Sequence, residues 1–326
     1  MDLTLTRGDK AFFWVTRVVS ALGVIVTAWA AVATGSMLVH GHPAYLVLLV
    51  LAFVVSAVFA VRSWPMRRVT PRKRKVARSA LAVMSLGVIA LVWWLVPSSA
   101  QQPALSAMNS DQAVTVTETV DRIVMTPTRA ESTESTESTE STVGVFFQPG
   151  ALVDARAYAA VLRPIAEAGH LVVIPKQPLG IAFLSTQVFA SLRDEDTTVT
   201  RWVVGGHSLG GTVAAMNAEA FAEAPTEPAV GLLLYASYPA TDLGGLQAQV
   251  TSISGSNDGL ATVAKIDASK AVLPSGSTYL VINGGVHSYF GDYGAQAGDG
   301  EPTITHDAAR HTVSQASVAF VNSVEE

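Results

Sequence analysis

The stretch Gly206-His207-Ser208-Leu209-Gly210 is a G-x-S-x-G pattern that follows an apolar run and precedes a run of small residues. The first run is typical of a strand and the second of a helix. A strand that turns abruptly into a helix strains its middle residue and lifts that side chain above the sheet. The helix start also offers unpaired N–H groups there. The pattern predicts Ser208 as a nucleophile and His207 as a packing residue; the alternative is a glycine-rich turn without chemistry.

A serine hydroxyl is a weak nucleophile without a base, so the chain must also supply a histidine and an acid. In strand-to-helix turns of this kind they follow in the order serine, acid, histidine. Apart from His207, His287 is the histidine that follows a predicted strand, and we expect it to be the base. Asp258 follows the strand before it and is the expected acid, with Asp242 as the alternative. Asp292 comes after His287, out of order.

Predicted strands and helices alternate from residue 143 onwards, which favours an α/β fold with a doubly wound, mostly parallel sheet. The strands are continuous apolar runs, as expected when helices cover both faces of the sheet. Ligands in such sheets bind at the carboxyl ends of the strands, where the candidate residues are expected. The predicted strands are 143–148, 170–175, 200–206, 230–239, 250–256 and 278–284, and the predicted helices include 155–169, 181–195 and 303–324.

The segments before residue 143 are of lower complexity. Partial alternation over 113–128 predicts one or two strands, or a hairpin. The EST triplet is repeated four times over 131–142. It gives no apolar face with the period of a helix or with that of a strand, so we expect a solvated loop. Small polar residues over 100–112 predict a linker. We therefore expect an α/β domain over 113–326 and a separate segment over 1–99.

The first 99 residues have the composition of a membrane anchor. They contain three uncharged apolar runs, 18–39, 44–61 and 80–96. Each is close to the roughly 17–25 residues that cross a bilayer as a helix, whereas a buried core helix is the alternative for any single run. Aromatic residues flank the runs, as at membrane interfaces. We therefore expect three transmembrane helices.

Basic residues between the second and third runs indicate the orientation: Arg62, Arg67, Arg68, Arg72, Lys73, Arg74, Lys75 and Arg78. The positive-inside rule places this loop in the cytoplasm and the α/β domain outside it. Reading the first run as a cleaved signal peptide would leave that domain on the same side. The chain after residue 99 has ten basic and 24 acidic residues, which argues against nucleic acid as a partner. With no cysteine, disulfides and thiolate chemistry are excluded.

Four blocks carry a resemblance to a known family: 148–159 (QPGALVDARAYA), 205–211 (GGHSLGG), 254–262 (SGSNDGLAT) and 284–300 (GGVHSYFGDYGAQAGDG). Together they resemble the α/β-hydrolase superfamily and, more narrowly, bacterial membrane-anchored domain proteins described as dienelactone-hydrolase-like. The resemblance spans about 143–324 and implies an α/β-hydrolase fold with Ser208, Asp258 and His287 as nucleophile, acid and base. Dienelactone hydrolases proper use a cysteine nucleophile, which this chain lacks.

The resemblance also implies where an oxyanion would bind. The N–H of Leu209 corresponds to the first donor, and the N–H of Ala151 or Leu152, in the loop 149–154, to the second. Many superfamily members insert a lid where this chain has only 240–249, so we expect no large lid.

The activity implied is that of a membrane-anchored extracytoplasmic serine hydrolase, acting on carboxylic esters through an acyl-enzyme. It needs neither a metal nor an organic cofactor. The expected partners are a small-molecule or lipid ester and, for the N-terminal helices, membrane lipids. The alternative from another class is a non-catalytic envelope or lipid-binding domain on the same scaffold, because a fold does not fix a function.

Overall fold

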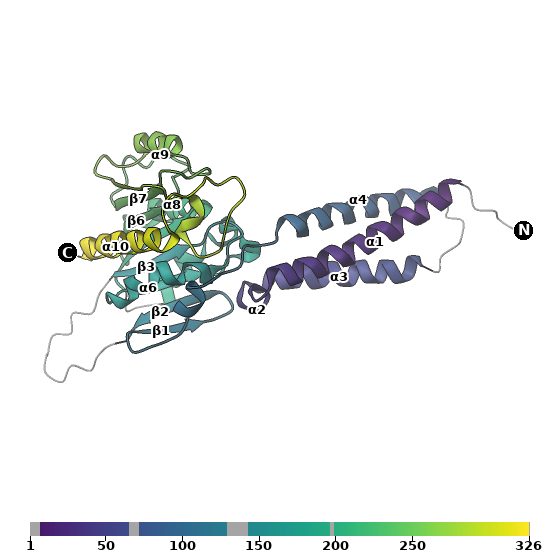
Figure 1. Ribbon diagram of the computed structural model, residues 1–326, viewed down its shortest axis with the longest axis horizontal. Coiled ribbons are helices and arrows are strands. Elements are labelled where there is room, and N and C mark those ends of the chain that lie inside the picture. The colour runs from purple at the N-terminus through teal and green to yellow at the C-terminus, as the bar shows by residue number, and fades with distance from the viewer. Residues whose placement is uncertain (1–6, 65–71, 129–142, 196–198, 326) are drawn as a thin grey trace, which may run out of the picture. The chain divides into compact units, whose positions relative to one another are not determined.

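The structure is a computed structural model that describes residues 7–64, 72–128, 143–195 and 199–325 (Figure 1). The chain divides into two compact units, Met1–Pro97 and Ser98–Glu326. Where it is described, the first unit is helical, whereas the second contains an eight-stranded sheet. The EST repeat over 131–142 lies outside the described residues, as do Arg67 and Arg68 of the basic loop.

The first unit contains α1 (Arg7–Thr34), the short α2 (Met37–His40), α3 (Pro43–Ser63) and α4 (Arg72–Trp94). The predicted run 18–39 is wrong at its end, because Gly35 has a φ of 55° and interrupts the helix after Thr34. The predicted run 44–61 lies within α3, where His42 caps the N-terminus and Pro43 occupies the first turn. The predicted run 80–96 extends two residues past the end of α4.

Two of the three expected spans are long and apolar enough to cross a membrane. These are Lys10–Thr34 in α1 and Pro43–Ser63, which is α3. In α4 the apolar part is the shorter stretch Ser79–Trp94, because the first turns of that helix carry Arg and Lys. The expectation of three full-length spans is therefore corrected to two, with a shorter apolar helix after them.

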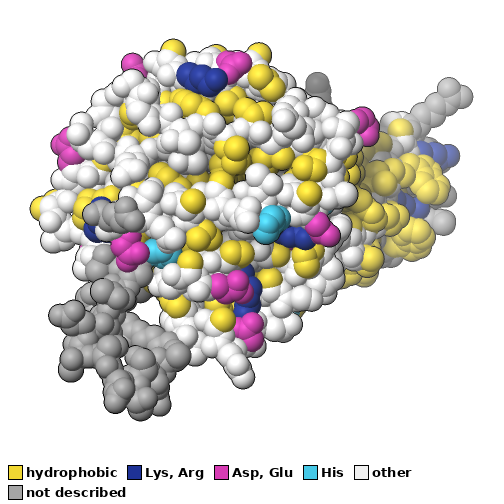
Figure 2. Space-filling view, turned by 60° about the vertical axis from the view of Figure 1, so that its left-hand side comes forward, with side chains coloured by type: hydrophobic (Ala, Val, Ile, Leu, Met, Phe, Trp, Pro, Cys, Tyr) yellow, Lys and Arg dark blue, Asp and Glu magenta, His cyan; other side chains and the backbone are white. Residues whose placement is uncertain are grey.

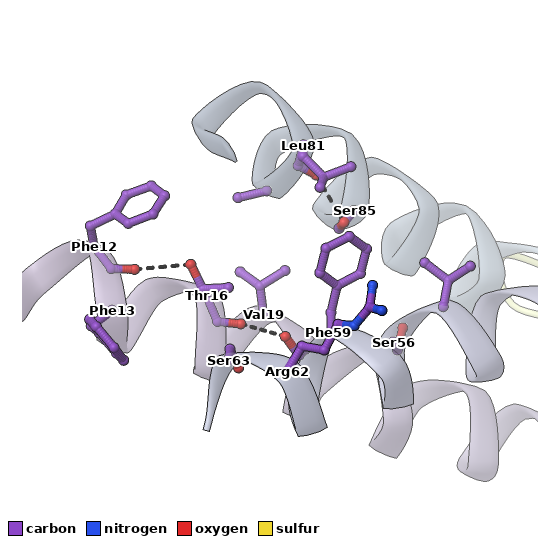
Figure 3. A pocket seen from close by; sticks show the side chains of 13 residues that line it. Phe12, Phe13, Thr16, Val19, Ser56, Phe59, Arg62, Ser63, Leu81 and Ser85 are labelled. Atoms are coloured by element: carbon purple, nitrogen blue, oxygen red, sulfur yellow. Dashed lines mark hydrogen bonds between the residues drawn. The ribbon is translucent and has the colours of Figure 1, made fainter. Parts of the chain in front are cut away.

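A cavity of about 280 Å³ lies between α1, α3 and α4 (Figure 3). Four of the hydroxyl groups that line it donate within their own helices; Thr16, for example, donates to the carbonyl of Phe12, and Ser85 donates to the carbonyl of Leu81. These internal bonds give the four hydroxyl groups a partner in an otherwise apolar wall.

The second unit is built on a sheet with the strand order β1-β2-β4-β3-β5-β6-β7-β8. β1 and β2 form an antiparallel hairpin, as expected for 113–128, and β2 pairs antiparallel with β4. All pairs from β4 to β8 are parallel. The strands are β1 (Val114–Glu118), β2 (Arg122–Pro127), β3 (Val143–Gln148), β4 (Leu171–Pro175), β5 (Arg201–His207), β6 (Ala229–Tyr235), β7 (Gln249–Gly255) and β8 (Thr278–Ile282).

Each face of the sheet has its own apolar core. One core holds Phe147, Tyr158 and Tyr235, and the other holds Phe146, Phe189 and Trp202. This alternation along β3 explains why the strand is buried at every position. The helical elements are α5 (Ala104–Ala107), η1 (Ala155–Tyr158), α6 (Ala159–Glu167), η2 (Pro178–Gly180), η3 (Ala182–Ser185), α7 (Val188–Glu195), α8 (Leu209–Phe221), α9 (Val263–Ser269), η4 (Lys270–Val272), η5 (His287–Phe290) and α10 (His306–Glu325).

The predicted linker 100–112 is instead part of the second unit. Ala100 and Ala104 are buried in its core, and the N–H of Gln101 donates to the carbonyl of Asp292. The small residues that suggested a tether pack closely in this core, because the methyl side chain of alanine can be buried without leaving a polar side-chain atom unpaired. The predicted helix 181–195 is likewise divided, into η3 and α7.

The segment between β6 and β7 determines how the carboxyl edge of the sheet is covered. Residues 236–248 contain neither helix nor strand. This agrees with the expectation that the short segment 240–249 forms no large lid.

Candidate active site

The turn between β5 and α8 holds Ser208 in a strained conformation, with φ 52° and ψ −123°. Three glycines permit the close packing around it. A Cβ on Gly206 would lie 2.4 Å from the carbonyl carbon of Gly210, and a Cβ on Gly210 would lie 2.2 Å from the carbonyl oxygen of Pro149. A Cβ on Gly211 would lie 2.4 Å from Oγ of Ser237. Real Cβ atoms do not approach this closely, so the turn requires glycine at all three positions.

Hydrogen bonds then hold the turn from neighbouring segments. The N–H of Ser208 donates to the carbonyl of Tyr235 at 3.0 Å, and Oγ of Ser237 donates to the carbonyl of Ser208 at 2.6 Å. Ser208 itself is only half-buried. The serine side chain is therefore attached to a fixed backbone while remaining open to solvent. Ser237 could not be identified from the sequence, because no motif marks a serine that bonds to the end of a neighbouring strand.

The structure brings His287 and Asp258 together at the ends of β8 and β7. Nδ1 of His287 lies 2.8 Å from Oδ2 of Asp258, and both side chains are buried. Oδ1 of Asp258 accepts the N–H groups of Leu260 and Ala261, each at 2.7 Å. An ionised carboxylate can only accept, so Nδ1 of His287 carries the proton. Nε2 of His287 is then left with a lone pair, and it has no hydrogen-bond partner among the described residues.

Asp242, the alternative acid, occupies a different environment. It is exposed, and its Oδ1 accepts the N–H of Gly244 at 2.9 Å within a local turn. Of these two aspartates, Asp258 is the one in contact with His287.

A second carboxylate, that of Asp299, bonds both to the loop that carries Asp258 and to the loop that carries His287. Oδ1 of Asp299 accepts the N–H groups of His287 at 2.9 Å and of Gly259 at 3.3 Å, and Oδ2 accepts the N–H of Ser288 at 2.8 Å. Burial alone would raise the pKa of Asp299, but bonds from backbone N–H groups hold the pKa below its ordinary value. Asp299 lies within 284–300, one of the blocks that carry the family resemblance. No local sequence pattern, however, predicts that its carboxylate bonds to two separate loops.

Almost every backbone N–H in the loop after β3 already has a partner. Pro149 has no N–H, Gly150 donates to the hydroxyl of Tyr158, and Leu152 donates to the carbonyl of Gly180 at 2.8 Å. The N–H groups of Val153 and Asp154 also donate, to the carbonyls of Gly150 and Ser98. Within the described part of the chain, no bond is formed by the N–H of Ala151, which is an exposed residue, or by that of Leu209 at the start of α8. Of the expected pair Ala151 and Leu152, it is Ala151 whose donor is available.

His207 is buried, as expected for a packing residue, but it also lies against His287. Its ring centroid is 4.5 Å from that of His287, and its Nδ1 is 2.8 Å from the hydroxyl of Tyr158. Burial, and then the neighbouring His287, hold the pKa of His207 well below its usual value. His207 is therefore neutral at pH 7.

Asp292 follows His287 in the chain but contacts Arg310 and His306. Its Oδ1 lies 2.7 Å from the guanidinium of Arg310 and 3.5 Å from Nε2 of His306, while its Oδ2 is buried without a partner in the described structure. Burial raises the pKa of Asp292 to about 6, although Arg310 lowers it and the charge of Asp307 raises it further. Among the described residues, no group of three or more His, Asp or Glu side chains could hold a metal ion.

Comparison with known proteins places the chain in a family. Residues 144–311, just over half of the chain, match the model of the alpha/beta hydrolase family. That model describes the family as a whole rather than its dienelactone-hydrolase-like members. A search of curated protein sequences gave no significant match.

Three solved structures illustrate the similarity. They are a predicted CIB-like hydrolase from Thermoplasma acidophilum (13% identity, TM-score 0.46, covering 64% of this chain and 98% of that chain), an esterase from Thermogutta terrifontis (15%, 0.45, 65% and 92%) and carboxyl esterase 2 from Tuber melanosporum (11%, 0.47, 70% and 91%).

The raised pKa of Asp292 predicts a pH-dependent stability. Its folded-state pKa of about 6 exceeds the ordinary value of 3.8, so the folded state binds the proton more tightly and loses stability as the pH rises between these values. Asn does not titrate, so we expect the free energy of unfolding of Asp292→Asn, relative to that of the wild type, to increase as the pH rises from 4 to 7. Urea unfolding of the full chain across this range measures the difference. A difference that stays constant with pH would contradict the assignment.

Proposed function

The chain belongs to the α/β-hydrolase family, and we propose on this premise that it is a serine hydrolase that cleaves carboxylic esters. The observation that carries the proposal is the 2.8 Å contact between Nδ1 of His287 and Oδ2 of Asp258. That pair lies beside His207, which immediately precedes Ser208 in the strained turn. A nucleophile, an orienting acid and a base, on the loops that follow β5, β7 and β8, are the groups that acyl transfer requires.

In the proposed reaction, Nε2 of His287 accepts the proton of Ser208 as Oγ attacks the ester carbonyl carbon. The ester C–O bond then breaks, and the alcohol leaves with the proton from His287. Water, deprotonated by the same nitrogen, attacks the acyl-enzyme and releases the acid and free Ser208. Asp258 keeps the proton on Nδ1 and stabilises the imidazolium that forms in each half of the reaction.

The oxyanion of each tetrahedral intermediate would be bound by the N–H groups of Leu209 and Ala151. Both lack a partner among the residues that the structure describes, and the loop after β3 contacts the start of α8 directly through Pro149 and Gly210. A donor held ready for the developing charge contributes about 10²–10³-fold in rate.

The proposed substrate is a small-molecule or lipid ester. Ser208 is half-buried and Ala151 is exposed, while residues 236–248 form no helix over the site. An uncovered site suits acyl groups that can be reached from solvent or from a lipid surface. A screen of short- and long-chain acyl esters, with thioester and peptide substrates as further arms, would identify the class.

We further propose that the first unit anchors the chain in a membrane and that the hydrolase domain is extracytoplasmic. The large apolar side chains that are exposed belong mostly to α1, α3 and α4, whereas the larger unit shows scattered charges (Figure 2). The basic residues between α3 and α4 favour a cytoplasmic loop. The domain then lies outside if α4, with its shorter apolar stretch, also crosses.

Labelling with a fluorophosphonate probe tests the nucleophile. We expect the full chain to be labelled and Ser208→Ala to lose the label completely, because the probe reacts with an activated serine. Ser314→Ala is the control, since Ser314 is buried in α10 and donates to the carbonyl of Val161. Labelling that survives in Ser208→Ala would disprove the nucleophile. A wild type inert to the probe and to activated esters would favour a non-catalytic scaffold.

Ester turnover by two aspartate variants tests the acid. Asp258→Asn should lower kcat by about 10⁴-fold, because the amide no longer stabilises the imidazolium or the required tautomer. Asp242→Asn removes the same charge from an exposed turn and should leave kcat within about twofold. If Asp242→Asn proved the inactive variant, the acid would be misassigned.

Two reporter fusions test the topology. A fluorescent protein that matures in the cytoplasm should be bright when fused after Ser63 and dark when fused after Glu326, because α4 lies between the two points. A phosphatase reporter should give the opposite pattern. Equal signals at both positions would show that α4 does not cross the membrane.

A further inference from the structure

A buried bridge of two hydrogen bonds connects the loop after β3 to the end of β5. The N–H of Gly150 donates to the hydroxyl of Tyr158 at 2.9 Å, and the same hydroxyl lies 2.8 Å from Nδ1 of His207. Tyr158 and His207 are almost completely buried. The bridge therefore joins the loop that carries Ala151 to the residue immediately before Ser208.

The hydrogen positions in the bridge follow from the number of donors. The hydroxyl of Tyr158 accepts from Gly150, so its own hydrogen is free to be donated to Nδ1 of His207. In the reverse arrangement, with Nδ1–H as donor, both the hydroxyl hydrogen and Nε2 of His207 would lack a partner. The first arrangement leaves one unpaired group instead of two, and burial makes each costly. His207 is thus the Nε2–H tautomer with Nδ1 as acceptor.

The bridge sits where the backbone has no room to shift. A Cβ on Gly150 would lie 2.7 Å from Nδ1 of His207 and 3.0 Å from the hydroxyl of Tyr158. The ring of Tyr158 packs against Phe147, with centroids 5.4 Å apart. The position of Gly150 is therefore set by both side chains, and Ala151 is the next residue.

We propose that Tyr158 and His207 are positioning residues that hold the N–H of Ala151 where the oxyanion forms, beside Ser208. This inference rests on the proposed function, because it concerns a donor to the intermediate of that reaction. Neither side chain touches the substrate; both act through the backbone of the loop.

The neutral state of His207 is part of this role. A protonated His207 could not accept at Nδ1, and the bridge to Tyr158 would lose its second bond. It would also place a cation next to His287, which must itself take up a proton during each half of the reaction. Burial and the nearness of His287 keep the pKa of His207 low, which maintains both conditions.

Tyr158→Phe tests the proposal, because it removes the hydroxyl and retains the ring. We expect kcat for an activated ester to fall roughly 10- to 100-fold with little change in KM. This loss is smaller than the roughly 10²–10³-fold loss that removal of an oxyanion donor causes, because the N–H of Ala151 would be misplaced rather than absent. Affinity for a boronic acid, which forms a tetrahedral adduct on the serine, should fall in parallel.

Ser317→Ala is the control. Ser317 is buried in α10, and its hydroxyl bonds to the hydroxyl of Tyr235 and to the carbonyl of Val313 rather than to the loop after β3. Its loss should affect stability without lowering kcat or the affinity for the boronic acid. Because Tyr158 and His207 form one bridge, Tyr158→Phe combined with His207→Phe should cost little more than either change alone.

The outcomes separate this inference from the proposed function. If the wild type turns over esters and Tyr158→Phe matches Ser317→Ala in kcat and boronate affinity, the positioning role is overturned and the hydrolase assignment stands. Fully additive losses in the double variant would overturn the single bridge. A wild type without turnover or boronate binding would overturn both.

Discussion

Ser208 has a backbone conformation that L-residues rarely adopt, and most of the site is arranged around the contacts that hold it there. The strand and helix on either side meet so closely that Gly206, Gly210 and Gly211 cannot carry a Cβ. The same closeness brings the start of α8 against the carbonyls of Gln148 and Pro149. Backbone contact between β5, α8 and the loop after β3 therefore sets both the height of the serine and the place of the donors near it.

Backbone N–H groups, more than side-chain pairs, fix the remaining loops. Asp258 accepts two N–H groups in addition to the ring of His287, and Asp299 accepts from both loops that carry these two residues. Charge-assisted bonds of this kind are shorter and stronger than neutral ones. These bonds fix the relative positions of Asp258 and His287, although both residues lie in loops, which are usually mobile.

The parallel strands and the strained turn could be predicted from the sequence, because apolar runs and a G-x-S-x-G pattern are local signals. Asp258 and His287 could be selected by chain order, and the structure brings them into contact. Tyr158, Ser237 and Asp299 could not, since each acts through a partner distant in sequence. The prediction of a linker over 100–112 was wrong for a related reason. Alanine occurs both in tethers and in packed cores, and the residues that surround it in the fold decide between the two.

The proposed reaction requires Ser208 to become acylated during turnover. Quenching the full chain with acid during hydrolysis of an activated ester, followed by peptide mass mapping, detects this acyl group. We expect an added acyl mass on the peptide that contains Ser208. In the wild type this mass should disappear on further incubation without ester, whereas in His287→Ala chains that have been acylated chemically it should remain. Turnover without an acyl mass on that peptide, or with the mass on another residue, would rule out Ser208 as the nucleophile.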